Sequence, residues 1–153
     1  MSVLTLAARN WFTWNFSLLD GERPVAEVYL SSWRERGTLK AEGTDYRVYR
    51  ESLLGDFLLE QSGSVIARAE KPSMFYRSFI IRYKEKSYTL QARSAFRRAF
   101  VLLDGEHQIG SIVPKSAFTR NSVVTLPDQW PLPIKSFAIW LTIVHWQRDA
   151  NAN

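Results

Sequence analysis

LLDGERPVAEVYL, residues 18–30, returns as LLDGEHQIGSIVP at residues 102–114, with the same five letters at the start and apolar residues at matching offsets. In each copy two apolar residues end a strand, Asp-Gly makes the turn because glycine tolerates a positive φ, and a partly alternating segment leaves as the next strand. Each copy therefore predicts a β-hairpin. A third and looser copy, LLEQSGSVIARA at residues 58–69, is one residue longer in its turn.

The spacing of the two close copies bears on the architecture. They begin 84 residues apart, which is too long for one unit of a solenoid. A fold with two related halves and a fold that uses one hairpin twice both fit this spacing, and the second alternative suffices. In either case the repeat predicts meandering antiparallel sheet.

Alternation extends the prediction along the chain. From Phe12 to Leu18 every second residue is large and apolar, and the residues between them are polar. This pattern is typical of a sheet with one buried face. Glycines punctuate the intervals between such segments. The whole pattern predicts about twelve strands, at 3–8, 11–19, 25–31, 38–41, 45–51, 56–61, 64–70, 76–84, 87–93, 98–104, 107–113 and 121–126.

A different pattern begins at PDQWPLPIKSFAIWLTIVHWQRDANAN, residues 127–153. Prolines at its start can open a helix but not lie inside one, and residues 132–147 predict about four helical turns. Apolar side chains lie nearly all round the helix axis, which indicates burial on every side. The core positions predicted for this helix are Phe137, Trp140, Leu141 and Val144.

A transmembrane span is the alternative for residues 132–147. Sixteen residues reach only about 24 Å, against a hydrocarbon core of about 30 Å. Lys135, Thr142 and His145 also argue against a span. We therefore expect an interior helix and no transmembrane segment.

The edge strands of a sheet must be paired or shielded, and a helix that is apolar on every side must be buried. A sheet that closes around the helix meets both requirements. The predicted fold is mainly β, a twelve-stranded antiparallel β-barrel around a hydrophobic C-terminal helix. With 153 residues the chain has the length of one domain. We place that domain at residues 1–148 and a short polar tail at 149–153.

The same order of elements resembles a known family. The segments LLDGEHQIGSIV, SAFTR and LPDQWPLPIKSFAIWLTIVHWQRDA are similar to the LURP-one-related group of the tubby C-terminal-like superfamily, which includes the phospholipid scramblases, and the chain looks like a short bacterial-type member. The resemblance is strongest over residues 93–150. It implies a tubby-like barrel around a central helix, and much less about activity. Tubby proteins bind phosphoinositide head groups through basic residues on the barrel exterior. No specific tubby motif matches those basic residues, and the scramblase features of a proline-rich arm, a cysteine cluster and an acidic calcium motif are missing from the sequence.

Composition excludes several chemistries. The chain has no cysteine, so disulfides and thiolate sites are ruled out, and this absence favours the cytoplasm. The start of the sequence lacks the pattern of a signal peptide. Its two histidines, His107 and His145, lie far apart and predict no metal site, and glycine-rich phosphate loops are absent. We expect neither an enzyme nor a cofactor.

Charge is distributed unevenly along the chain, whose net charge is +5. All of the excess positive charge lies in the second half of the chain. In the predicted hairpin at 76–93, strand alternation places four basic side chains on the outer face. These candidate anion-binding or lipid-binding residues are Arg82, Lys84, Lys86 and Arg93. A purely solvating charged face is the bland alternative. Nucleic acid is less favoured, because Tyr83 and Tyr88 fall on the inward face, where they cannot stack on bases.

Two functional hypotheses follow from this pattern. The first is a binding module that docks on anionic phospholipid head groups, cytoplasmic and peripheral at the membrane. The second is a protein-interaction scaffold, with an unknown protein partner and no lipid or nucleic-acid ligand. A small-molecule carrier is disfavoured, because the helix would occupy the barrel interior.

Overall fold

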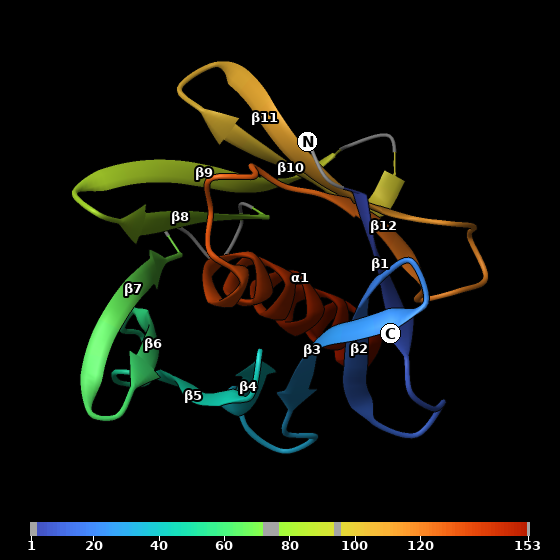
Figure 1. Cartoon of the computed structure of the whole chain (residues 1–153), viewed down its shortest axis with the longest axis horizontal. Helices are drawn as coiled ribbons and strands as arrows, with labels where there is room; N and C mark the ends of the chain where they lie inside the picture. Colours follow the sequence, from blue (N-terminus) through green and yellow to red (C-terminus); the bar gives the residue numbers. More distant parts are fainter. Residues whose placement is uncertain (1–2, 72–76, 94–95, 153) are drawn as a thin grey trace.

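The structure is a computed structural model that describes residues 3–71, 77–93 and 96–152. Twelve strands form one closed barrel, in which each strand pairs antiparallel with its neighbours in the chain and β1 pairs with β12 to complete the circle. A single helix, α1, runs through the middle of the ring of strands (Figure 1). The predicted fold class is confirmed. The expected strand residue Tyr76 and the tail residue Asn153 lie outside the described residues.

The strands lie close to their predicted positions. Their bounds are β1 Val3–Ala8, β2 Trp14–Asp20, β3 Arg23–Leu30, β4 Gly37–Ala41, β5 Thr44–Arg50, β6 Phe57–Gln61, β7 Ser64–Glu70, β8 Ser78–Tyr83, β9 Lys86–Arg93, β10 Phe96–Asp104, β11 His107–Pro114 and β12 Ser122–Thr125. The largest difference is at β2, expected to begin at Trp11. The Oδ1 atom of Asn10 accepts hydrogen bonds from the backbone N–H groups of Phe12 and Thr13, and this local turn delays the strand.

Both close copies of the repeated sequence form hairpins, and each contains a β-bulge at the same position. In β2–β3 Leu18 faces Ala26 while Leu19 faces Pro24, so Val25 has no partner across the ladder. The hairpin β10–β11 skips Ile109 in the same way. Both bulge residues are partly buried and pack against the core. The bulge therefore adds an apolar contact that strict alternation would not place there.

The third copy follows the same plan. In β6–β7 Leu59 faces Ala67 and Glu60 faces Val65, and the skipped residue Ile66 packs against the core. Its turn has two residues, as in the other copies, so the prediction of one extra residue in this turn is wrong. The equivalent leucines Leu18, Leu59 and Leu102 are about 42 residues apart. The bulged hairpin thus recurs three times around the barrel, once in every four strands, and not twice.

The helix α1 spans Leu132–Ala152 and is longer than the predicted 132–147. The carbonyl of Pro131 accepts the first helical hydrogen bond, from Lys135 N–H at 3.1 Å. At the other end, Asp149 to Ala152 are helical and do not form a separate tail. Ion pairs of Arg148 with Glu35 and of Asp149 with Arg77 fix these polar residues to the barrel, which the apolar pattern does not reveal.

No helix in residues 3–71, 77–93 or 96–152 unites the length and the apolar character needed to cross a bilayer.

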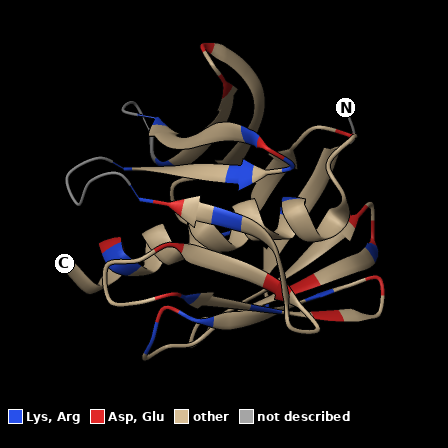
Figure 2. Cartoon of the chain, turned by 90° about the vertical axis from the view of Figure 1, so that its left-hand side faces the viewer, with Lys and Arg blue, Asp and Glu red and all other residues tan. Residues whose placement is uncertain are grey.

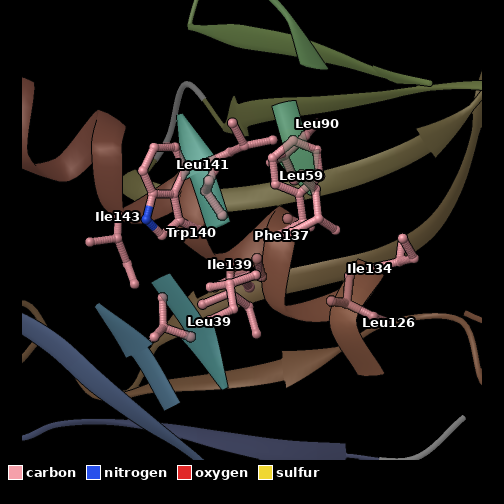
Figure 3. Close-up of a cluster of buried hydrophobic side chains, with 14 of the residues drawn as sticks. Leu39, Leu59, Leu90, Leu126, Ile134, Phe137, Ile139, Trp140, Leu141 and Ile143 are labelled. Carbon is pink, nitrogen blue, oxygen red and sulfur yellow. The ribbon is translucent and has the colours of Figure 1, made fainter. Parts of the chain in front are cut away.

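The core surrounds α1 on all sides (Figure 3). Phe137, Trp140, Leu141 and Val144 are completely buried. The indole Nε1 of Trp140 donates a hydrogen bond to the carbonyl oxygen of Tyr29 at 3.2 Å, which ties the helix to β3. A Cβ atom on Gly37 would lie 1.8 Å from that oxygen and 2.7 Å from the indole nitrogen, so only glycine allows this close packing.

The two ends of the barrel differ in their connections. At one end, the turn end, five two-residue turns at 21–22, 42–43, 62–63, 84–85 and 105–106 join the strands. At the other end, the loop end, α1 terminates among the longer connections 9–13, 31–36, 51–56 and 115–121. Long loops at the end of a rigid scaffold commonly carry binding residues. The loop end is therefore where a functional site is to be sought first.

Candidate functional site

Arg82, Lys84, Lys86 and Arg93, the residues predicted from the sequence, are all exposed. Two of them already have partners: Arg82 Nη2 lies 2.9 Å from Glu70 Oε2, and Lys86 Nζ lies 2.7 Å from Asp104 Oδ2. Lys84 lies in the turn between β8 and β9 with a positive φ of 50°. Arg93 lies at the opposite end of β9.

These residues do not share a single face. Lys86 is directly opposite Tyr83, and its ammonium group lies 5.5 Å from the ring centroid of Tyr88. Residues opposite each other in a ladder project on the same side of the sheet. Lys86 therefore projects with the tyrosines at the barrel rim, on the side opposite Arg82. The expectation of one common face is wrong for Lys86, because it has the strand parity of Tyr88.

The loop end carries the most exposed large apolar side chains of the described residues. Each of the connections 9–13, 31–36, 51–56 and 115–121 presents at least one, with exposed fractions of 83% for Trp11, 92% for Phe12, 93% for Trp33, 88% for Leu53, 81% for Leu54 and 90% for Phe118. Elsewhere the large apolar residues that are exposed are valines, none above 59%. A set of exposed aromatic and leucine side chains at one end of a molecule marks an interaction surface.

Charge separates along the same axis. Near the turns, acids predominate: Asp20, Glu22, Glu42, Asp45, Glu60, Glu85, Asp104 and Glu106 against Arg23, Lys40, Arg82, Lys84 and Lys86. Near the loops, bases predominate: Arg9, Arg34, Arg36, Arg50, Lys71, Arg77, Arg93, Arg98, Lys115, Arg120 and Arg148 against Glu35, Glu51, Asp56, Glu70 and Asp149. Figure 2 shows acids at the tips of several turns far from the C-terminus, and both acids and bases near the C-terminus. The molecule is an electrostatic dipole whose positive end carries the exposed aromatics.

Ion pairs hold the loops of this end to the helix. The carboxylate of Glu35 accepts hydrogen bonds from Arg148, with Nη2 at 2.7 Å, and from Arg50, with Nη1 at 3.2 Å. Burial raises the pKa of Glu35, but Arg148 and Arg50 outweigh burial and hold it below its ordinary value. Gln147 Nε2 also donates to the carbonyl of Ser31 at 3.0 Å. The connection 31–36 is thus held firmly, with Trp33 at its exposed tip.

A cleft opens at the loop end beside the last turns of α1. Its volume is about 430 Å³, and we call it the arginine cleft; its lining residues are Trp14, Arg77, Arg98, Arg120, Trp146, Asp149, Ala150 and Ala152. Arg98 lies over the ring of Trp146, with Cζ 5.2 Å from the centroid, and Arg120 lies over Trp14 at 4.8 Å. Burial lowers the pKa of both guanidinium groups, and the charge of Arg98 lowers that of Arg120 further.

Sequence reasoning did not select the residues of this cleft. Arg77 and Arg98 lie before and after the two strands of the β8–β9 hairpin, whereas Arg120 belongs to SAFTR, and Trp146 with Asp149 to WQRD. Strand alternation cannot join them, because they come from separate segments that meet only when the barrel closes. The available signal lay in the family resemblance, because SAFTR and the segment that contains WQRD are among the residues on which it rests.

A second group of charges surrounds the buried His145, near the C-terminal end of α1. Burial lowers the pKa of His145 to about 4, and the positive charges of Lys71, Arg77 and Arg148 lower it too, although Asp149 raises it. Burial also lowers the pKa of Lys71 to about 8, with Arg148 and Arg50 adding to the effect. Within the described part of the chain, no group of three His, Cys, Asp or Glu side chains could hold a metal ion. This end of the barrel therefore concentrates positive charge.

Comparison of the chain with protein-family models, with curated proteins and with solved structures found no match.

Proposed function

We propose that this protein is a non-enzymatic binding module that docks on anionic phospholipid surfaces through the loop end of its barrel. One observation carries the proposal: every described connection of the loop end that is longer than two residues exposes a large apolar side chain, at the end where bases outnumber acids. Tryptophan and phenylalanine side chains bind favourably in the interfacial layer of a bilayer. Each basic residue near an anionic surface adds on the order of 1 kcal/mol.

The charge distribution also fixes the orientation of docking. An anionic surface attracts the loop end and repels the acidic turn end, so the barrel stands with α1 pointing its C-terminus at the lipid. Such a protein is cytoplasmic and peripheral at the membrane. The resemblance to tubby-like barrels, which bind phosphoinositide head groups, supports the same class of ligand.

A protein-interaction scaffold is the second candidate, because exposed apolar side chains also mark protein interfaces. In this protein the exposed apolar side chains lie on separate loops and are surrounded by basic residues. This arrangement suits a fluid anionic bilayer, whereas a protein partner would be matched better by one continuous apolar patch. The lipid hypothesis is therefore preferred.

Sedimentation with phosphatidylglycerol vesicles tests the proposal. The double variant Trp33→Ser and Phe118→Ser should bind at least about tenfold more weakly than the parent, because each side chain loses an interfacial contact. The matched control is Val65→Ser, near the turn end, which should bind normally. Replacing Arg82, Lys84, Lys86 and Arg93 by serine should leave folding intact and preserve most of the vesicle binding.

Two results would overturn this assignment. Loss of binding in the quadruple serine variant, with normal binding by the loop variant, would transfer the docking surface to the β8–β9 hairpin. Failure of the parent protein to bind anionic vesicles at any salt concentration would remove the lipid function and leave the interaction scaffold.

A further inference from the structure

The arginine cleft has the features of a preformed anion site. Arg98 is fixed at two points by one tryptophan: its carbonyl oxygen accepts a hydrogen bond from Trp146 Nε1 at 2.9 Å, and its guanidinium group lies over the same indole ring. The side chain is half-buried. A guanidinium group held in place before binding loses little conformational entropy when it meets a ligand.

Arg120 is fixed by a different set of contacts. Its Nη1 donates to the carbonyl of Thr13 at 3.0 Å and its Nη2 donates to the carbonyl of Asn10. A guanidinium group has five N–H donors, so donors remain after these two bonds. The ring centroids of Trp14 and Phe16 lie 4.8 and 5.3 Å from its Cζ atom. The two tryptophans of the cleft thus position arginines.

The described residues do not neutralise the positive charge of this pair. Among the residues that the structure describes, no carboxylate lies within ion-pair distance of Arg98 or Arg120. The one acid in the lining, Asp149, lies 3.4 Å from Arg77. Three guanidinium groups and one carboxylate leave a net charge of two positive in the lining. Two partly desolvated cations side by side are costly unless an anion joins them.

We propose that the arginine cleft binds a phosphomonoester, the terminal phosphate of a small molecule or of a lipid head group. A phosphomonoester carries nearly two negative charges at pH 7, which matches the net charge of the lining. Its several oxygens can accept from more than one guanidinium fork, whereas a carboxylate has only two. The volume of about 430 Å³ lies within the usual range for ligand pockets, roughly 300–1,000 Å³, and leaves room for an adjoining glycerol or sugar. As a lipid site, the cleft rests on the proposed membrane docking.

Soluble ligands test the cleft independently of any membrane. Calorimetric titration should show glycerol 3-phosphate binding at least about tenfold more tightly than dimethyl phosphate, a diester with one charge. Arg98→Gln should weaken glycerol 3-phosphate binding about tenfold to a hundredfold, and Arg98→Lys should restore part of it. Arg23→Gln, at the turn end, is the matched control and should bind like the parent. Binding should also weaken as the pH falls through about 6, where the phosphate loses its second charge.

Folding of the variants is checked separately. If Arg98→Gln does not fold, protection of the parent from thermal unfolding by glycerol 3-phosphate, and not by dimethyl phosphate, carries the same information. Equal binding of the monoester and the diester, or no binding of either, would overturn the proposal.

Vesicles distinguish the source of the phosphate. Phosphatidic acid should retain the parent better than phosphatidylglycerol at matched surface charge, and Arg98→Gln should abolish the difference while binding through the loops continues. Binding of glycerol 3-phosphate without a preference for phosphatidic acid would support the cleft and identify a soluble phosphomonoester as its ligand. If no vesicle binds but glycerol 3-phosphate does, the docking function fails and the cleft stands. If anionic vesicles bind without preference and glycerol 3-phosphate does not bind, docking stands and the cleft proposal fails.

Discussion

At the scale of single residues, His145 places a titratable group in the core. It is 5% exposed, and neither ring nitrogen has a hydrogen-bond partner among the described residues. Its ring packs against Phe100 in a T-shaped arrangement, with centroids 5.4 Å apart. Nε2 lies 3.6 Å from a carboxylate oxygen of Asp149, but burial and the surrounding cations dominate and hold its pKa at about 4. The folded protein therefore carries this imidazole neutral.

A neutral buried histidine makes stability depend on pH. The pKa of His145 is about 4 in the folded state and about 6.5 in the unfolded chain. Between these values the unfolded chain binds more protons, so stability falls as the pH is lowered through this window, by on the order of 3 kcal/mol. Urea unfolding midpoints of the parent from pH 7 to pH 4 should show this loss.

The other histidine supplies the control. His145→Gln should show a much smaller decrease of the midpoint over the same pH range, whereas His107→Gln, at the exposed first residue of β11, should behave like the parent. An identical pH dependence in His145→Gln and the parent would show that other groups cause it.

At the scale of elements, the bulged hairpin is the unit that the repeated sequence encodes. Each of the three copies places one extra apolar residue, Val25, Ile66 or Ile109, toward the core near the turn end. A bulge bends its strand and increases the local twist. Repetition at equal intervals distributes this bending around the circle, which helps a twelve-stranded sheet to close.

A deletion tests whether the bulge is separable from the register. Removing Val25 leaves Leu18 facing Ala26 and Leu19 facing Pro24 in a regular ladder, so we expect a folded protein that is less stable by about 1–3 kcal/mol, the contribution of one apolar side chain. Removing Glu27 instead slips the rest of β3 by one residue, which sends its buried side chains outward, and should abolish folding. Circular dichroism and thermal melting compare the two. Equal damage from both deletions would contradict this account of the bulge.

Prediction from the sequence succeeded where one local rule applied. Alternation located the strands, and the all-round apolar surface identified α1 as an interior helix. The alternation did not reveal the bulges, because a bulge residue such as Ile109 only interrupts the apolar–polar pattern. The last turn of α1 was missed because its order comes from distant partners, Glu35 and Arg77. The arginine cleft was missed for the same reason.

At the scale of the whole molecule, the two ends of the barrel differ in charge and in exposed apolar surface. The turn end is acidic and tightly connected, and the loop end is basic with exposed aromatic side chains. A protein built in this way should approach an anionic surface with one end only.

Single cysteines can report this orientation, since the natural chain has none. Phe118→Cys, labelled with a polarity-sensitive fluorophore, should give a blue-shifted emission when anionic vesicles are added, because the label enters the interfacial layer. Glu106→Cys, at an exposed turn, should show no shift. A blue shift of the turn-end label, or equal shifts of both, would contradict docking by the loop end.

The position of α1 after all twelve strands has a consequence for biosynthesis. A nascent chain that has emerged only as far as β12 contains every strand, but it lacks the residues that fill the interior. A ring that closed at that stage would leave its interior unfilled, and an open sheet would leave apolar faces and edges to solvent. Closure between β1 and β12 also joins segments more than 100 residues apart, which is slow to form. We therefore expect the barrel to fold only after the helix has been synthesised.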